Sequence, residues 1–201
     1  MPQATLRTAR LELVPLAENH LSFLIELNSD PVVHRFLSAQ GLTPQESAEQ
    51  LRHALTAAKE APGLGQWVGS YRGEPIGLWM LQPPHEQGQP PRPREADLGY
   101  RLPQRHWRQG YASEGARELV RHGFEDLGLD RIFAQTMTVN QASRATMAAV
   151  GLRFVRTFVE EHAVPIPGHE QGEEEYDVTR ERWSRPVDRS VESDPPGREV
   201  G

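Results

Sequence analysis

The sequence predicts an α+β fold, in which helices flank a mixed α/β sheet. Two observations carry this prediction. Strand-like apolar patterns alternate with helical periodicity through the middle of the chain, and a meander of strands precedes them while two strands follow. The length of 201 residues fits one domain with a tail. We expect that domain at residues 1–183 and a disordered tail at residues 184–201, which are polar and rich in proline.

The first half of the chain predicts a strand, two helices and a β-hairpin. We place these elements, in chain order, at residues 6–16, 21–27, 44–58, 67–71 and 75–81. The second helix has the clearest start, because Thr43 is a good capping residue and Pro44 fits the first helical turn. The hairpin follows from two strand patterns around the turn Arg72-Gly73-Glu74.

The second half predicts two consecutive strand–helix units and two final strands. These elements lie at residues 96–102, 113–127, 131–139, 140–150, 154–160 and 176–183. A glycine closes each of the two helices, at Gly128 and at Gly151. Residues 82–94 hold five prolines and no apolar periodicity, so we expect an extended or mobile loop there.

Composition excludes several kinds of chemistry. The chain has no cysteine, which rules out disulfides, thiolate metal sites and a cysteine acyl-enzyme. It has no apolar run long enough to span a membrane, and Met1–Arg10 lacks the apolar centre of a signal peptide. We therefore expect a soluble cytoplasmic protein without a membrane partner.

Charge is unevenly distributed along the chain. The net charge is −6, and residues 160–182 alone carry eight acidic residues against Arg180 and Arg182. In contrast, Arg101, Arg105 and Arg108 stand in a run without an acid. One region therefore favours cations and the other favours anions. Because no basic stripe is present, a nucleic-acid partner is not expected.

Two predicted helices begin directly after neighbouring strands, and both starts suit an anion. A helix N-terminus offers free N–H groups and the positive end of the helix dipole. At the first start, Gly110 and Ala112 let the backbone approach a pyrophosphate, and Arg108 adds positive charge. The glycine spacing fits neither a dinucleotide-binding turn nor a P-loop. An ordinary helix start with an exposed arginine is the alternative.

At the second start, Asn140 is the expected N-cap. Ser143 and Arg144 follow one turn later on the same face. A plain cap followed by a solvated arginine is again the alternative. The pairing of two such starts on consecutive strand–helix units favours a site for a long anionic cofactor.

Four motifs in order resemble the GNAT superfamily of acetyl-CoA-dependent N-acetyltransferases, most closely the branch of ribosomal-protein N-terminal acetyltransferases. They are Leu98-Gly99-Tyr100, His106-Trp107-Arg108-Gln109-Gly110-Tyr111-Ala112-Ser113-Glu114, Val139-Asn140-x-x-Ser143 and Val150-Gly151-Leu152. The resemblance spans about residues 5–183, since the opening and closing segments are also similar to that branch. Arg108 stands where the branch frequently has glycine.

The resemblance implies a single domain with a mostly antiparallel sheet of six to seven strands, splayed at a central parallel pair. It also implies acetyl-CoA as co-substrate and no metal. The residues expected to bind acetyl-CoA are Leu98, Tyr100, Leu102, Trp107, Arg108, Gln109, Gly110, Tyr111, Ala112, Ser113, Asn140, Ser143 and Arg144.

The implied reaction is direct attack of an amine on the acetyl thioester, which agrees with the lack of cysteine. A backbone N–H in the strand Leu98–Leu102 is expected to stabilise the oxyanion, and Ser143 to act near the sulfur. Asp97 and Glu95 are the candidate bases, and strand alternation puts both on one face. His162 and Glu173–Glu175 are rivals. Each of these polar groups could instead be a solvated surface group.

The function expected from the sequence is acetyl transfer to a primary amine of a protein N-terminus or of a small molecule. A domain that binds CoA without catalysis, as a sensor or interaction module, is the alternative. The sequence leaves a homodimer open.

Overall fold

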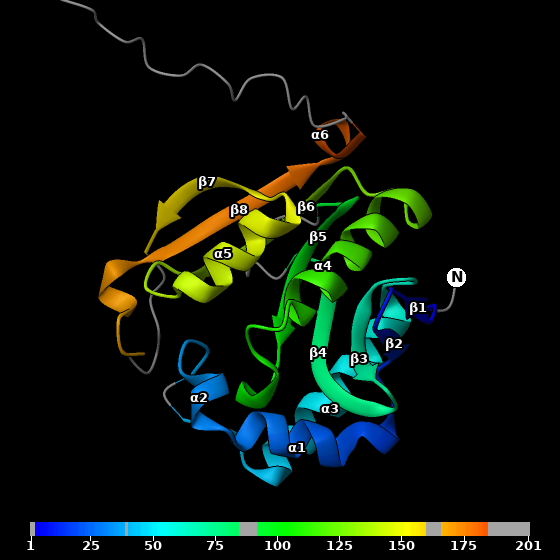
Figure 1. The fold of residues 1–201 in the computed structure, drawn as a ribbon, viewed down its shortest axis with the longest axis vertical. Coiled ribbons are helices and arrows are strands. Elements are labelled where there is room, and N and C mark those ends of the chain that lie inside the picture. Colours follow the sequence, from blue (N-terminus) through cyan, green and yellow to red (C-terminus); the bar gives the residue numbers. More distant parts are fainter. Residues whose placement is uncertain (1–2, 39, 85–91, 160–165, 185–201) are drawn as a thin grey trace, which may run out of the picture.

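The computed structural model describes residues 3–38, 40–84, 92–159 and 166–184. Their centre is one sheet of eight strands in the order β1-β2-β3-β4-β5-β6-β8-β7 (Figure 1). The strands are β1 (Leu6–Arg7), β2 (Glu12–Pro15), β3 (Gly65–Tyr71), β4 (Glu74–Gln82), β5 (Glu95–Arg101), β6 (Arg131–Met137), β7 (Arg153–Phe158) and β8 (Glu173–Thr179). All neighbours are antiparallel except β5 and β6. The prediction of a mostly antiparallel sheet with a parallel pair is confirmed.

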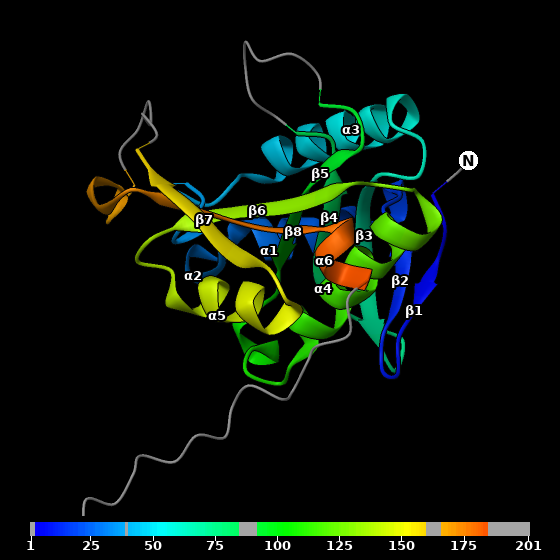
Figure 2. The same ribbon diagram turned by 90° about the horizontal axis from the view of Figure 1, so that it is seen from above.

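Helices cover both faces of this sheet. They are α1 (Leu21–Ser29), α2 (Pro31–His34), α3 (Pro44–Glu60), α4 (Tyr111–Arg121), α5 (Gln141–Val150) and α6 (Arg180–Ser184). Figure 2 shows α3 on the opposite side of the sheet from α4 and α5. Consecutive residues of β3 accordingly enter different cores: Trp67 joins the cluster under α4 and α5, and Val68 joins the cluster with α1 and α3. None of the helices in the described ranges is long and apolar enough to cross a membrane.

The central parallel pair separates after three residues. Glu95, Ala96 and Asp97 of β5 pair with Arg131, Ile132 and Phe133 of β6. Beyond Asp97, β5 stays bonded to β4 while β6 stays bonded to β8. The two strands therefore diverge toward their C-terminal ends, which confirms the expected splay.

The sheet has eight strands rather than the six to seven expected, because residues 6–16 do not form one strand. The chain turns between β1 and β2, where the Thr8 amide donates to the Leu11 carbonyl at 2.9 Å and Thr8 Oγ1 accepts from the Leu11 amide at 2.8 Å. Loop contacts of Thr8 with Glu114 stabilise this turn, and such long-range contacts leave no local pattern.

The last two strands also differ from their predicted bounds. The final strand starts at Glu173, not at residue 176, and ends where α6 begins at Arg180. Glu173–Glu175 thus belong to a strand between β6 and β7, rather than to an acidic loop. Arginines on the neighbouring elements neutralise this strand, which is why it can be acidic and buried. Residues 160–165, with His162, lie outside the described residues. The predicted tail at residues 184–201 also lies outside them, except for Ser184, which ends α6.

Candidate active site

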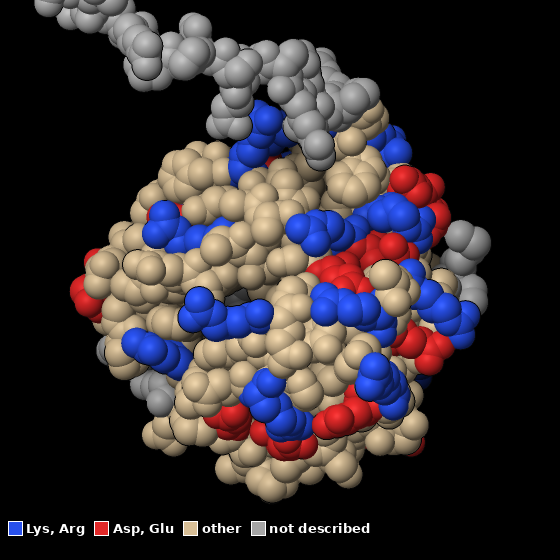
Figure 3. All heavy atoms as spheres, in the orientation of Figure 1, with Lys and Arg blue, Asp and Glu red and all other residues tan. Residues whose placement is uncertain are grey.

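The splay between β5 and β6 opens between two helix N-termini. Gly110 is the N-cap of α4, which follows β5, and Asn140 is the N-cap of α5, which follows β6. Because β5 and β6 are parallel, both helices begin at the same edge of the sheet. Figure 3 shows a hollow on this face of the molecule, just below α5 in that view, with Lys or Arg side chains on its rim.

The start of α4 is shaped to receive an anion. Gly110 has a left-handed backbone, with a φ of 80°, and no side chain among the described residues caps the helix. The preceding Arg108 is exposed and also left-handed, with a φ of 58°. A helix start without a side-chain acceptor keeps N–H groups available for phosphate oxygens. These residues therefore fit the pyrophosphate of acetyl-CoA.

Arg10, which precedes Gln109 by 99 residues in the chain, fixes this turn. Its Nε donates to Glu114 at 2.6 Å, its Nη1 donates to the Gln109 carbonyl at 3.0 Å, and its guanidinium lies 4.5 Å from the centre of the Tyr111 ring. This role of Arg10 was not predicted from the sequence. No local sequence pattern indicates this role, because Arg10 and Glu114 are far apart in the chain.

Several predicted cofactor residues are already engaged within the protein. The Trp107 ring nitrogen donates to the Leu102 carbonyl at 2.6 Å, and Tyr111 is buried against Tyr71 at 5.4 Å between ring centres. The Ala112 carbonyl accepts a hydrogen bond from the Trp79 ring nitrogen, and Leu98 and Leu102 are core residues.

Two further predicted cofactor residues lie at the start of α4. The Gln109 side chain donates to the Arg105 carbonyl, and Ser113 is half-buried in the first turn of α4. Most of these residues could meet a cofactor only through the backbone.

The start of α5 is held by its own side chains. Asn140 Oδ1 accepts from the Ser143 amide at 3.2 Å, which is the predicted cap. Arg144 forms an ion pair with Glu174 at 2.7 Å and donates to the Thr138 carbonyl at 3.2 Å. Arg144 is therefore not the free solvated arginine of the alternative reading.

Ser143 contacts Tyr100 across the splay. The Tyr100 hydroxyl lies 3.1 Å from the Ser143 carbonyl oxygen and 3.2 Å from Ser143 Oγ. Burial raises the pKa of Tyr100 to about 12, against hydrogen bonds with Ser143 and Thr146 that lower it. The phenol is therefore protonated at neutral pH, and this pair of hydroxyls can pass a proton between β5 and α5.

The two candidate bases share a face of β5 but differ in their surroundings. Burial, and then the negative charge of Glu175, raise the pKa of Asp97 to about 6. No hydrogen bond or ion pair to the Asp97 side chain occurs among the described residues. Glu95, in contrast, is paired with Arg131 at 3.0 Å and with Arg92 at 3.4 Å. Asp97 is therefore better suited to accept a proton.

The alternative candidate bases on β8, Glu174 and Glu175, already form ion pairs with arginines. Glu175 is buried and pairs with Arg156 at 2.7 Å and with Arg131. Glu174 is buried, accepts from the Tyr176 hydroxyl at 2.7 Å, and pairs with Arg144. Within the described ranges, no group of three or more histidine or acidic side chains could hold a metal ion.

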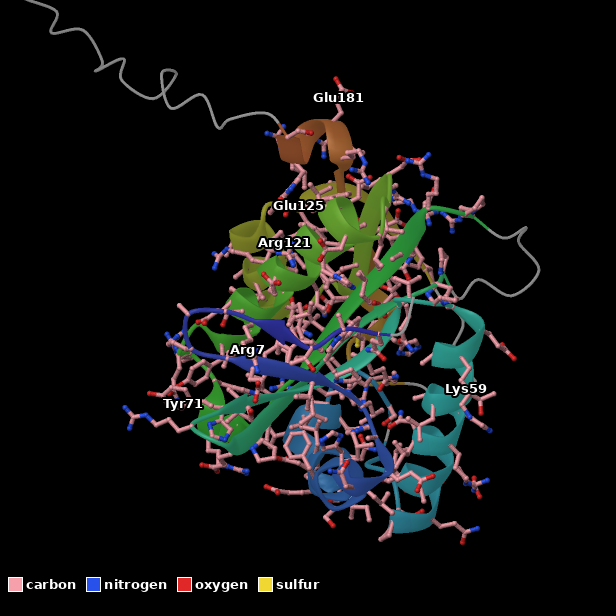
Figure 4. All side chains as sticks on the ribbon, turned by 90° about the vertical axis from the view of Figure 1, so that its right-hand side faces the viewer. Arg7, Lys59, Tyr71, Arg121, Glu125 and Glu181 are labelled. Carbon is pink, nitrogen blue, oxygen red and sulfur yellow. The ribbon has the colours of Figure 1, made fainter. Side chains whose placement is uncertain are left out.

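A separate shallow pocket lies on the outer side of α4, and its Arg121 is already paired with acidic side chains. Its lining includes Glu118, Arg121 and Glu125. Arg121 pairs with Glu118 at 2.8 Å and with Glu125 at 3.1 Å, and Figure 4 shows Arg121 and Glu125 together on this side. The saturated arginine makes this pocket a weaker anion site than the start of α4.

Comparison with known proteins agrees with this geometry. Residues 10–153 match the family model for the acetyltransferase (GNAT) domain. The FsC-acetyl coenzyme A-N(2)-transacetylase of Aspergillus fumigatus is 44% identical over 186 residues, which cover 91% of this chain and 79% of that protein.

Solved structures share the fold. The ribosomal L7/L12 α-N-protein acetyltransferase RimL, in complex with coenzyme A, superposes with a TM-score of 0.72 at 16% identity, over 88% of this chain and 99% of RimL. Mycobacterium smegmatis RimJ superposes with a TM-score of 0.71 at 18% identity, over 87% of this chain and 84% of RimJ.

Proposed function

Because the chain belongs to the GNAT acetyltransferase family and is an acetyl-CoA-dependent N-acetyltransferase, we propose that its acceptor is the primary amine of a small molecule. The observation that carries this choice is the extended similarity to the Aspergillus fumigatus relative, whose name specifies transfer to a nitrogen, N(2). A protein N-terminus is the alternative acceptor. It rests on RimL and RimJ, whose similarity to this chain is that of the fold alone.

In this proposal, acetyl-CoA lies in the splay with its pyrophosphate at the start of α4. The uncapped N–H groups behind Gly110 and the charge of Arg108 support that placement. The pantetheine arm follows the part of β5 that has left β6, where alternate backbone N–H and C=O groups of Leu98–Leu102 point into the gap. One of these N–H groups stabilises the negative charge that develops on the acetyl oxygen.

Asp97 removes a proton from the ammonium group of the acceptor, directly or through a water molecule, and so releases the neutral amine that attacks. Its raised pKa supports this role, because a base works best when its pKa lies near the working pH. The amine nitrogen then forms its bond to the acetyl carbon while the bond from that carbon to sulfur breaks. Ser143, hydrogen-bonded to Tyr100, gives its proton to the departing thiolate, and the second proton, which the nitrogen loses on acylation, restores the Ser143 hydroxyl.

Release of free CoA thiol tests this proposal directly. The chain has no cysteine, so a thiol-reactive dye reports CoA without background from the enzyme. We expect thiol release with acetyl-CoA and a small primary amine, together with a product one acetyl group heavier by mass spectrometry.

Two other results would point away from the proposal. Turnover of N-terminal peptides alone would favour the protein acceptor. Protection from heat by acetyl-CoA, with no turnover of any amine, would favour the module that binds CoA without catalysis.

A further inference from the structure

Arg101, the last residue of β5, has no carboxylate partner among the described residues. Its Nη1 donates to Asn28 Oδ1 at 2.9 Å and lies 3.4 Å from His34 Nε2. Its Nε is buried and has no hydrogen-bond partner in the described part of the chain. Burial lowers the pKa of Arg101 to about 10, so the guanidinium is still charged at neutral pH.

Asn28 is fixed as a neutral acceptor for Arg101. Asn28 is fully buried, and its Nδ2 donates to Ser47 Oγ at 3.2 Å and to Gln50 Oε1 at 2.9 Å. Because both amide hydrogens are used on α3, the amide oxygen must face Arg101.

His34 is fixed in the same way. Ser38 Oγ donates to the Gln40 carbonyl, so it accepts from His34 Nδ1–H at 2.9 Å. His34 Nε2 is then the unprotonated nitrogen that faces Arg101. Burial and the charge of Arg101 lower the pKa of His34, against Asp30, which raises it. The imidazole is therefore neutral at neutral pH and leaves the charge of Arg101 uncompensated.

The contrast with Arg131 shows how unusual this setting is within the same sheet. Arg131 pairs with Glu95, Glu175 and Asp177. Buried charges are normally paired in this way, because an isolated one is costly. At Arg101 the buried Nε, which lies on the edge of the guanidinium that suits two parallel bonds to a carboxylate, has no hydrogen-bond partner among the described residues.

Arg101 also shares a face of β5 with the proposed base. Strand alternation puts Asp97, Gly99 and Arg101 on one side, opposite Tyr100, which contacts α5. Asp97 and Arg101 are about 13 Å apart along the strand. Gly99 between them has no side chain, and the end of the Met80 side chain from β4 lies over it. One face of β5 therefore carries a carboxylate and a guanidinium that form no ion pair within the described ranges.

We infer that Arg101 binds a carboxylate of the acceptor, so that the substrate is an amine that also carries an acid, such as an amino acid. The ammonium end of such a molecule faces Asp97, and its carboxylate faces Arg101. This inference rests on the proposed function, because it names the class of small amine that the same site takes. The proposed pyrophosphate site at α4 is not the partner of Arg101, because α4 packs on the face of the sheet that carries Ala96 and Leu98, opposite Arg101.

The test compares pairs of amine acceptors that are identical except that one carries a carboxylate and the other a neutral carboxamide. Initial rates of CoA release are measured for a panel of L-amino acids and for their carboxamides. We expect kcat/KM to be at least 10-fold higher for the preferred acid than for its amide. In Arg101→Gln, the ratio of kcat/KM for the acid to kcat/KM for the amide falls toward one. In Arg101→Lys this preference for the acid is partly retained. The affinity for acetyl-CoA, measured by calorimetry, is unchanged in both variants. Arg105→Gln is the matched control, because Arg105 forms an exposed pair with Glu26.

Two results would overturn the inference and leave the proposed function standing: equal rates for acids and amides, or a preference that survives in Arg101→Gln. If no amine is turned over, the proposed function fails and binding decides the inference separately. With CoA present, calorimetry compares N-acetyl amino acids with their amides. Tighter binding of the acids, lost in Arg101→Gln, supports the subsite, and equal binding contradicts it. The comparison of acids with amides in the wild-type protein tests the inference even if a variant does not fold.

Discussion

The hydroxyl groups of Tyr100 and Ser143 lie 3.2 Å apart and join β5 to the first turn of α5. This contact spans the two strands where their pairing has ended. A proton donor is thereby held at the point where the thioester sulfur is expected to lie.

Removing the Ser143 hydroxyl should lower turnover more than cofactor binding. We expect Ser143→Ala to reduce kcat by roughly 100-fold, the lower range for a lost acid or base. Its affinity for acetyl-CoA should stay within about threefold, because the Ser143 amide still bonds to Asn140. Steady-state kinetics and calorimetry measure the two quantities, with the exposed Ser22→Ala as control. Unchanged turnover would remove Ser143 from the mechanism.

Tyr100→Phe should act through Ser143. We expect a smaller loss of kcat, about 10-fold, because the serine keeps its hydroxyl but loses its partner. The double variant with Ser143→Ala should be no slower than Ser143→Ala alone, since the two groups work as a unit. If the fold-losses of kcat in the two single variants multiply in the double variant, the two hydroxyls act independently.

Asp97 should set the acid limb of the pH profile. Since its pKa is raised to about 6, kcat/KM should rise with pH through about 6 as the carboxylate loses its proton. Asp97→Asn should lose most of its activity, and its remaining kcat/KM should no longer rise with pH through about 6. The comparison variant is Glu95→Gln, because Glu95 is the other candidate on the same face. If the limb disappears in Glu95→Gln and persists in Asp97→Asn, then Glu95 is the base.

The same carboxylate should reduce stability above its pKa. The pKa of Asp97 is raised from 3.8 to about 6 in the folded protein, so folding binds a proton in that window and stability falls as pH rises through it. At pH 8, Asp97→Asn should therefore be more stable than the wild type, by roughly 2–3 kcal/mol at most. Below about pH 4 the difference should vanish. Chemical denaturation at both pH values measures this, and an Asp97→Asn that is less stable at pH 8 contradicts it.

Gly110 offers a test of the cofactor turn with a matched control. Gly110 and Gly73 have left-handed φ values of 80° and 82°, and a Cβ would meet only Arg10 Nη2, at 3.4 Å, in the first case and nothing within 4 Å in the second. Both alanine variants should lose about 1 kcal/mol of stability from backbone strain. Gly110→Ala alone should weaken acetyl-CoA binding, measured by calorimetry. Equal acetyl-CoA affinities in the two variants would place the pyrophosphate elsewhere.

Local sequence signals predicted the elements that local chemistry controls. Thr43 accepts from the Glu46 amide and the Glu46 side chain bonds back, so the expected start of α3 is a complete capping box. The starts of α4 and α5 and the closing Gly151 were likewise visible, since each depends on residues close in the chain.

The missed features all depend on residues far apart in the chain. The separation of β1 from β2 and the role of Arg10 both depend on Glu114, more than 100 residues away. The neutral surroundings of Arg101 come from Asn28 and His34 on α1 and α2, and no spacing in the sequence links them. The burial that raises the pKa of Asp97 is equally invisible before the sheet is assembled.

Hydrogen exchange with and without acetyl-CoA tests the central claim, that the splay of β5 and β6 and the start of α4 hold the cofactor. We predict slower exchange, on binding, of the amides at residues 108–113 and 98–102, and unchanged exchange at the β3–β4 turn around Gly73. Binding that leaves both of these segments unprotected, or that protects only the outer pocket of α4, would contradict the account.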